Sequence, residues 1–212
     1  MTNFIPIFPL PLIVFPGEIL NLHIFEPRYK QLIQTCIKEN KPFGIPPVLD
    51  GSPRETGTLI EILEIVQLYE DGRMDIRTRG LQVFRVLEWM MEIPEKLYSG
   101  AIVHYLPNFE NGSRSMMQKI MGDMRKLHEI MQVNKKLDVP DDQLRSYDVA
   151  HHVGLSLEEE YELLGYENEL HRQEFLKRHL TRVLPVAEEM KKMQQRIMMN
   201  GHFKDLEGFS FN

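Results

Sequence analysis

Cys36 is the only cysteine in the chain, so it is the one side chain that could attack a substrate as a thiolate. Its neighbours at helical spacing, Tyr29, Leu32 and Ile33, are largely apolar, which predicts that Cys36 faces the inside of a helix over residues 27–38. A thiol in apolar surroundings keeps its proton and is a poor nucleophile. We therefore expect a buried, inert cysteine, and a single cysteine also excludes an internal disulfide.

The eight histidines are the other groups that could act as a base or bind a metal. His151 and His152 are adjacent, and on a helix their side chains would point about 100° apart, so they cannot share one ion. His171 and His179 lie two turns apart with Glu169 nearby, which we interpret as a solvated helix face. No metal-ligand spacing, nucleophile–base motif or phosphate-binding glycine loop occurs, so we expect no metal, no cofactor and no catalytic residue.

Three of the polar residues in an apolar N-terminal run could take part in a site. His23 is interpreted as a core histidine with a satisfied hydrogen bond. Glu26 and Arg28 could serve as an acid and a ligand clamp, or they could cap a helix and pair with neighbouring strands. We favour the second interpretation, because a carboxylate is stabilised at the positive end of a helix.

The N-terminal run, residues 4–29, is the segment around which the rest of the chain is organised. Proline fixes φ and lacks an N–H donor, so the run can be neither one helix nor a central strand. We predict a short strand over 5–8, an extended crossing of the core, a Pro16-Gly17 turn and a helix that begins at Pro27. The interrupting prolines are Pro6, Pro9, Pro11, Pro16 and Pro27.

A β-rich region follows, in which residues 46–54 are expected to form a loop. In residues 58–69 the polar side chains Glu61, Glu64 and Gln67 recur about every three positions, which would also suit a helix. Asp71-Gly72 then marks a hairpin turn, so we favour a strand. The strands are predicted over residues 43–45, 58–69, 73–79, 82–90 and 98–106.

Residues 73–79 alternate between a mostly apolar set and a charged set. We interpret the charged set as a solvated sheet face, because acidic residues are interleaved with the basic ones. The apolar set is Met74, Ile76 and Thr78, and the charged set is Arg73, Asp75, Arg77 and Arg79.

The character of the chain changes to helical after residue 108. We predict helices over 114–133 and 140–152, a short third helix that begins with a capping box at Ser156 and Glu159 and ends at Gly165, and a long fourth helix after Asn168. Pro185 should kink or split the fourth helix. Its apolar seam either lies on its own domain or is offered to another chain, as in a homodimer. The seam is Leu176, Leu180, Val183, Ala187, Met190, Gln194 and Ile197.

The opening sequence IPIFPLPLIVFPGEILNLHIFEPRY resembles the signature of the Lon protease amino-terminal (substrate-binding) domain family. A weaker match continues at Gly80, Phe84 and Arg85. The family pattern has a further arginine before the phenylalanine, whereas in this sequence Gln82 and Val83 precede Phe84. The helical half also matches by spacing, so the resemblance covers roughly residues 4–200. Its structural motif residues in the opening are Pro16, Gly17, Glu26, Pro27 and Arg28. Its helical matches are Leu155, Leu157, Leu163, Leu164, Arg172, Leu176 and Leu180.

This resemblance implies an α+β fold. We expect a PUA-like, twisted, antiparallel, open β-barrel over residues 1–108, a helical bundle over 113–200 that ends in a long helix, and a loose tail over 201–212. It also implies the recognition part of a protease without the ATPase or peptidase parts, and therefore a protein that is not an enzyme. The expected partners are unfolded or flexible polypeptides and, with them, a separate protease or chaperone.

The composition bears on the partner class. The net charge of −6 disfavours a nucleic-acid partner, although the PUA-like resemblance keeps an RNA-binding module as the alternative. No apolar run is long enough to span a membrane, and we expect a cytoplasmic protein.

Nine of the 13 methionines fall between Met116 and Met199, on surfaces that either fill a core or fit varied apolar partners. We expect exposed apolar polypeptide segments to bind in a groove between the barrel and the bundle. The candidate contact residues are Phe15, Phe25, Tyr29, Met117, Met121 and Met124.

Overall fold

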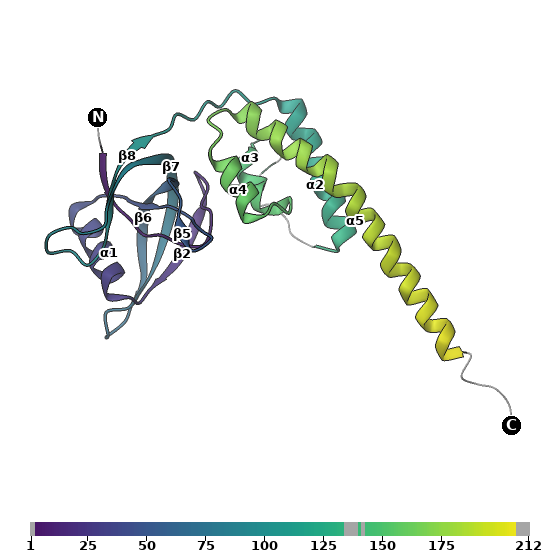
Figure 1. The fold of residues 1–212 in the computed structure, drawn as a ribbon, viewed down its shortest axis with the longest axis horizontal. Helices are drawn as coiled ribbons and strands as arrows, with labels where there is room; N and C mark the ends of the chain where they lie inside the picture. The colour runs from purple at the N-terminus through teal and green to yellow at the C-terminus, as the bar shows by residue number, and fades with distance from the viewer. Residues whose placement is uncertain (1–2, 134–139, 141–142, 207–212) are drawn as a thin grey trace.

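The computed structural model describes residues 3–133, 140 and 143–206. Figure 1 shows a β-rich part and a helical part side by side, with the end of the last helix projecting away from both. The strands are β1 (Asn3–Pro6), β2 (Ile19–Ile24), β3 (Phe43–Ile45), β4 (Val48–Leu49), β5 (Ser52–Pro53), β6 (Thr56–Leu68), β7 (Met74–Met90) and β8 (Gly100–Tyr105). The helices are α1 (Pro27–Glu39), α2 (Arg114–Met131), α3 (Ser146–Val149), the 3₁₀ turn η1 (Ala150–His152), α4 (Leu157–Leu164) and α5 (Glu169–Leu206).

The main sheet is antiparallel and curled, with strand order β1-β8-β7-β6-β3 and with β2 paired to β7. Its two end strands approach each other, because Ile7 forms a parallel bridge with Gly44 and the Phe8 N–H donates to the Gly44 carbonyl at 2.8 Å. The barrel stays open, and the predicted α+β class is confirmed. The expected loop over residues 46–54 instead contains the small β4–β5 hairpin.

The near-threefold polar period in β6 has a structural cause. The pairing of β6 with β7 shifts register between Ile62 and Glu64 and again between Ile65 and Gln67. Each bulge adds one residue, so Glu61, Glu64 and Gln67 all return to the same face of the sheet. The strand prediction is therefore confirmed, although the period resembles that of a helix.

β7 is one continuous strand, and the expected break between residues 79 and 82 is wrong. A third register shift falls where Ile60 pairs with Gly80 and Leu59 pairs with Gln82, which leaves Leu81 as the extra residue. Gly80 is required here because a Cβ atom would overlap the carbonyl oxygen of Phe15. The chain is tied at this point by two backbone hydrogen bonds, from the Gly17 N–H to the Gly80 carbonyl and from the Gly80 N–H to the Glu18 carbonyl.

The N-terminal run supplies side chains to each of the three hydrophobic clusters that the described residues form. Ile5 and Ile7 enter a cluster between β1, β7 and β8. Phe8 and Val14 enter a second cluster under α1. Phe15, together with Ile13, enters the core of the helical part, which also includes Leu106 and Val83 of the sheet. The two parts therefore share one apolar core rather than touching at their surfaces.

In the helical part the predicted helix caps agree with the structure better than the predicted helix lengths do. Ser156 and Glu159 form the predicted capping box, and Ser113 caps α2. The predicted helix over 140–152 is shorter: Ser146 begins a single turn of α-helix, a 3₁₀ turn follows, and residues 141–142 lie outside the described residues. α5 is not split at Pro185, and it continues through Leu206 into the expected loose tail, of which 207–212 lie outside the described residues.

α2 and α5 run side by side in the same direction. The Ser113 N–H donates to Gln173 Oε1 at 2.8 Å near their starts, and Lys126 Nζ lies 2.6 Å from Glu188 Oε1 further along. α2 ends five residues after Lys126, at Met131, and α5 extends past this end (Figure 1). Within the described residues no helix is long and apolar enough to cross a membrane.

Candidate functional site

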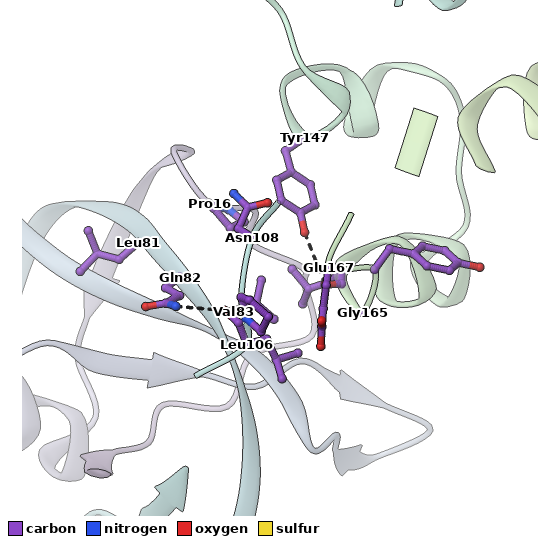
Figure 2. A pocket seen from close by; sticks show the side chains of 12 residues that line it. Pro16, Leu81, Gln82, Val83, Leu106, Asn108, Tyr147, Gly165 and Glu167 are labelled. Atoms are coloured by element: carbon purple, nitrogen blue, oxygen red, sulfur yellow. Dashed lines mark hydrogen bonds between the residues drawn. The ribbon is translucent and has the colours of Figure 1, made fainter. Parts of the chain in front are cut away.

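A cleft opens between the β-rich part and the helical part, as Figure 2 shows from close by. Its volume is about 320 Å³, at the small end of the range for ligand-binding cavities. Apolar side chains and two aromatic rings form much of its wall, with amide and carboxylate groups among them. The lining residues are Pro16, Leu81, Gln82, Val83, Leu106, Pro107, Asn108, Tyr147, Leu164, Gly165, Tyr166 and Glu167.

Five separate segments bring these residues together, and one of them is the connection from the end of α4 to α5, residues 164–167. The bulge in β7 turns Leu81 outward, where its side chain is 40% exposed at the cleft. Pro16 comes from the N-terminal turn, and Leu106 comes from the segment that leaves β8, where its N–H donates to the Val83 carbonyl. Tyr147 comes from α3. A cleft made this way exists only when both parts of the fold are docked.

Tyr147 is held from behind by a buried arginine. The Arg172 guanidinium carbon lies 4.3 Å from the centre of the Tyr147 ring, and Arg172 also donates to Asn108 Oδ1 at 2.8 Å and to the Tyr166 carbonyl at 2.7 Å. Arg172 is 2% exposed and pairs with Glu169 at 3.0 Å. One buried cation therefore orients three residues of the cleft.

A second set of contacts links the β-rich part to the helical part beside the cleft. Phe15 stacks on Tyr147 with ring centres 5.1 Å apart, and it lies 4.8 Å from the His151 ring. His151 Nδ1 is 2.7 Å from Glu160 Oε1 on α4, and Nε2 is 3.2 Å from Glu18 Oε2 just before β2. Desolvation opposes protonation, but the hydrogen bonds to Glu160 and Glu18 outweigh it and raise the pKa of His151 to about 9. Protonated His151 thus joins carboxylates of both parts.

The ionisable side chains in the wall of the cleft are the carboxylate of Glu167 and the phenols of Tyr147 and Tyr166. None of its lining residues is a histidine, lysine, arginine or cysteine. Cys36 lies elsewhere, buried, and desolvation raises its pKa to about 12, which confirms the prediction of an inert thiol. Among the described residues, no group of three histidines, cysteines or carboxylates is placed to hold a metal ion.

The six residues expected to contact a ligand do not share a surface. Phe15 and Tyr29 are 1% and 8% exposed, and Tyr29 stacks on Phe8 with ring centres 3.8 Å apart. The three methionines of α2 face the helical core and are 3–4% exposed. Phe25 is 58% exposed, but it lies on the outer part of the sheet beside His23. The buried methionines are Met117, Met121 and Met124.

Two sequence interpretations of histidines are corrected by the structure. His23 is not a core residue, because its side chain is 46% exposed and Nδ1 bonds Asp75 Oδ1 at 2.6 Å on the sheet surface. His179 and Glu169 do not lie on a solvated face, because they are 5% and 3% exposed. His179 is within hydrogen-bonding distance of the Val153 carbonyl at 3.1 Å. Apolar neighbours in sequence did not reveal which face of each element was covered.

The motif residues of the opening mostly have structural roles. Glu26 is the residue before the first turn of α1, but its side chain forms no cap hydrogen bond. It binds Arg28 at 2.8 Å instead of capping the helix, and both side chains are well exposed. Phe84 is fully buried in the sheet cluster. Pro27 occupies the first helical position, as predicted.

The arginines of the sheet face have acidic partners on the neighbouring strand. Arg79 Nε binds Glu61 Oε1 at 2.6 Å, and Arg77 binds Glu64 at 3.4 Å. This face is the solvated one predicted from the alternation in residues 73–79, since Met74 and Ile76 on the other face are buried. Paired side chains of both signs do not form a basic track for a phosphate backbone.

Sequence reasoning placed a groove between the two parts but missed its residues. Tyr147, Tyr166 and Leu81 were not singled out, because nothing in their sequence neighbourhoods distinguishes them from core or surface positions. One signal was available: Leu81 directly follows Gly80 in an otherwise alternating strand, and such a glycine often marks a bulge.

Comparison with known proteins gives a family and a fold. Residues 5–182 match the family described as the ATP-dependent protease La (LON) substrate-binding domain. A Lon N-terminal domain protein from Xanthomonas campestris superimposes with a TM-score of 0.63 at 24% identity, covering 82% of this chain and 96% of that one. The N-terminal domain of a Mycobacterium avium complex Lon protease gives a TM-score of 0.59 at 16% identity, with 84% and 98% covered. No curated protein matches the chain.

Proposed function

The chain belongs to the ATP-dependent protease La (LON) substrate-binding domain family, and from this premise we propose that it binds exposed apolar segments of other polypeptides without carrying out a reaction on them. The observation that carries the proposal is the cleft between the two parts of the fold. Its wall combines apolar side chains with amide groups. Such a wall is suited to retaining a peptide, and the proposal assigns no reaction to it.

The size of the cleft limits what it can hold. A volume of about 320 Å³ accommodates one or two large apolar side chains and part of their backbone. The Asn108 side-chain oxygen is engaged by Arg172, which leaves the amide nitrogen as a donor toward a peptide carbonyl. The ligand is therefore an extended segment that inserts apolar side chains beside Leu81 and Tyr166.

Binding of one segment should be weak. Burying about 200 Å² of apolar surface yields about 5 kcal/mol, from which the ordering of the segment and the loss of its free motion must be subtracted. A weak site suits the proposal, because a recognition module that meets many clients must also release them. A client with several apolar segments would be retained through repeated rebinding.

The test uses a fluorescently labelled, permanently unfolded polypeptide and measures anisotropy on titration with the full chain. Leu81→Ser removes the exposed apolar rim of the cleft, and we expect binding about fivefold to tenfold weaker. Leu87→Ser is the matched control, because Leu87 is 60% exposed on the same strand at another register shift, away from the cleft. It should leave the affinity unchanged.

Two further measurements separate the alternatives. Phe25→Ala removes the exposed phenylalanine of the sheet face, and a loss of affinity there with none for Leu81→Ser would move the site away from the cleft. A salt titration separates apolar peptide binding from RNA binding, since only RNA binding should weaken steeply as salt increases. Steep salt dependence with an RNA probe and no binding of unfolded polypeptide would contradict the proposal.

A further inference from the structure

The second half of α5, which runs beside the last turns of α2 and then past its end, carries an apolar stripe that is exposed within the described residues. Val186, Met190, Met193 and Ile197 are 54%, 58%, 66% and 65% exposed. At 100° per residue these four positions fall within an arc of about 60° on one side of the helix. The core-facing positions of the same helix, such as Leu184, point to another side and are buried. Val183, which packs against the helical core, lies only about 20° from Met190, so the stripe borders the core-facing side of the helix and is nevertheless exposed.

The spacing of the stripe is that of a short coiled-coil seam. Its steps of four, three and four residues are the alternation that keeps two helices in contact along a shared line. Such a seam needs a partner of the same kind, a second amphipathic helix. Among the described residues no other helix covers this stripe, so the helix of another molecule would supply the partner.

The charges beside the stripe identify the partner as a second copy of this chain. Glu189 and Arg196 lie seven residues apart on one flank of the seam. In an antiparallel pair, residues of this flank meet the same flank of the other helix, so Glu189 faces Arg196 of the second copy and the reverse contact forms as well. Within the described side chains neither of these two residues forms an ion pair, whereas Glu188 is bound to Lys126.

The same register aligns the apolar residues. When Glu189 faces Arg196, Met190 packs against Met193 of the second copy and Val186 packs against Ile197, each contact being made twice. A parallel pair would instead place Glu189 opposite Gln194 and would leave both charges without a partner. From this self-complementarity we propose that the distal part of α5 forms an antiparallel homodimer through Val186, Met190, Met193 and Ile197.

The expected affinity is modest. Two pairs of apolar layers bury less surface than a standard protein interface, so dimerisation should require micromolar concentrations or higher. The dimer leaves the cleft between the two parts of the fold open and places two copies of it on one assembly. It does not depend on what the cleft binds.

Sedimentation velocity of the full chain over increasing concentration is the first measurement, and it should show a monomer–dimer equilibrium. Glu189→Arg alone and Arg196→Glu alone each replace two attractive contacts by two repulsive ones, and each should weaken dimerisation about tenfold. An equimolar mixture of the two variants should restore it, because every contact in the mixed dimer pairs opposite charges. Equal dimerisation by both single variants and the wild type overturns the proposal.

The orientation is tested with a spin label at Thr181→Cys in a Cys36→Ala background. In the antiparallel register the two labelled positions lie about 30 Å apart along the helices, against about 10 Å across a parallel pair. A distance near 10 Å overturns the antiparallel arrangement. A wild-type chain that stays monomeric up to millimolar concentration overturns the dimer, whether or not an apolar peptide or a lipid vesicle binds the stripe.

Discussion

Phe15 and Phe25 both come from the N-terminal run and both lie beside a histidine that binds a carboxylate. Phe15 is 1% exposed, and its histidine, His151, is held between carboxylates from two parts of the fold. Phe25 is 58% exposed, and its histidine, His23, binds one carboxylate on an open sheet. Each set combines a phenylalanine, a histidine and a carboxylate. The two sets differ in burial: the Phe15 set lies between the two parts of the fold and links them, whereas the Phe25 set lies on the surface of the sheet.

The sharpest test of this comparison is the pair Phe15→Ala and Phe25→Ala. Phe15→Ala removes a ring from the shared core and should lower the free energy of unfolding by about 3–5 kcal/mol. Phe25→Ala removes an exposed ring and should change it by less than about 0.5 kcal/mol. Urea denaturation followed by circular dichroism measures both. Similar losses for the two variants would break the comparison.

A second pair of variants extends the comparison of buried and exposed residues to arginines. Arg172→Met leaves Glu169 buried without its cation and should destabilise the fold by about 3–5 kcal/mol. Arg79→Met removes an exposed ion pair with Glu61 and should cost at most about 1 kcal/mol. The same denaturation experiment applies to both. An unchanged midpoint for Arg172→Met would show that the buried network contributes nothing net.

The third pair compares methionines. Met121 on α2 is 3% exposed and Met193 on α5 is 66% exposed. Met121→Ala should lower stability by about 2–5 kcal/mol, while Met193→Ala should be neutral within about 0.5 kcal/mol when measured at concentrations that keep the chain monomeric. Thermal unfolding reports both values. A destabilised Met193→Ala monomer would mean that the distal helix packs on its own fold.

The smallest effect is expected for His151, and it depends on pH. The folded-state pKa is raised to about 9 from an ordinary 6.5, so the stabilisation is fully present below pH 6.5 and is lost as pH rises through 9. The side chain is 33% exposed, so screening limits the effect to about 1 kcal/mol. His151→Gln should therefore be less stable than the wild type at pH 6 and equal to it near pH 10. A difference that is constant with pH would assign the role of His151 to packing alone.

The elements of the fold were largely predictable because their signals are local. Proline at 27 begins α1, the Ser156–Glu159 capping box begins α4, and alternation along residues 73–79 separates the two faces of β7. These features act through hydrogen bonds and dihedral angles of adjacent residues. Errors arose where a register shift merged or extended an element, as at Leu81, because the shift depends on the strand that pairs with it.

The position of the candidate site was predictable from the sequence, but the residues that line it were not. The sequence indicated a groove between a β-rich and a helical part, yet the candidate contact residues other than Phe25 are core residues, namely Phe15, Tyr29, Met117, Met121 and Met124. Leu81 and Tyr147 line the cleft instead, and they belong to segments 66 residues apart in the chain. Which apolar residue faces a cleft depends on how the β-rich part and the helical part pack around their shared core.

The sequence by itself determined the family, the class of fold, the inert cysteine and the role of the proline-rich run, because each follows from residue type and near neighbours. Only the tertiary structure decided that His151 bridges the two parts while His23 stays on the surface. It also decided that Met117, Met121 and Met124 of α2 are buried, while Met190 and Met193 of distal α5 are not. The physical reason is that burial is a property of the partner surface, and an amphipathic pattern is the same whether its apolar face is covered from within the chain or left open.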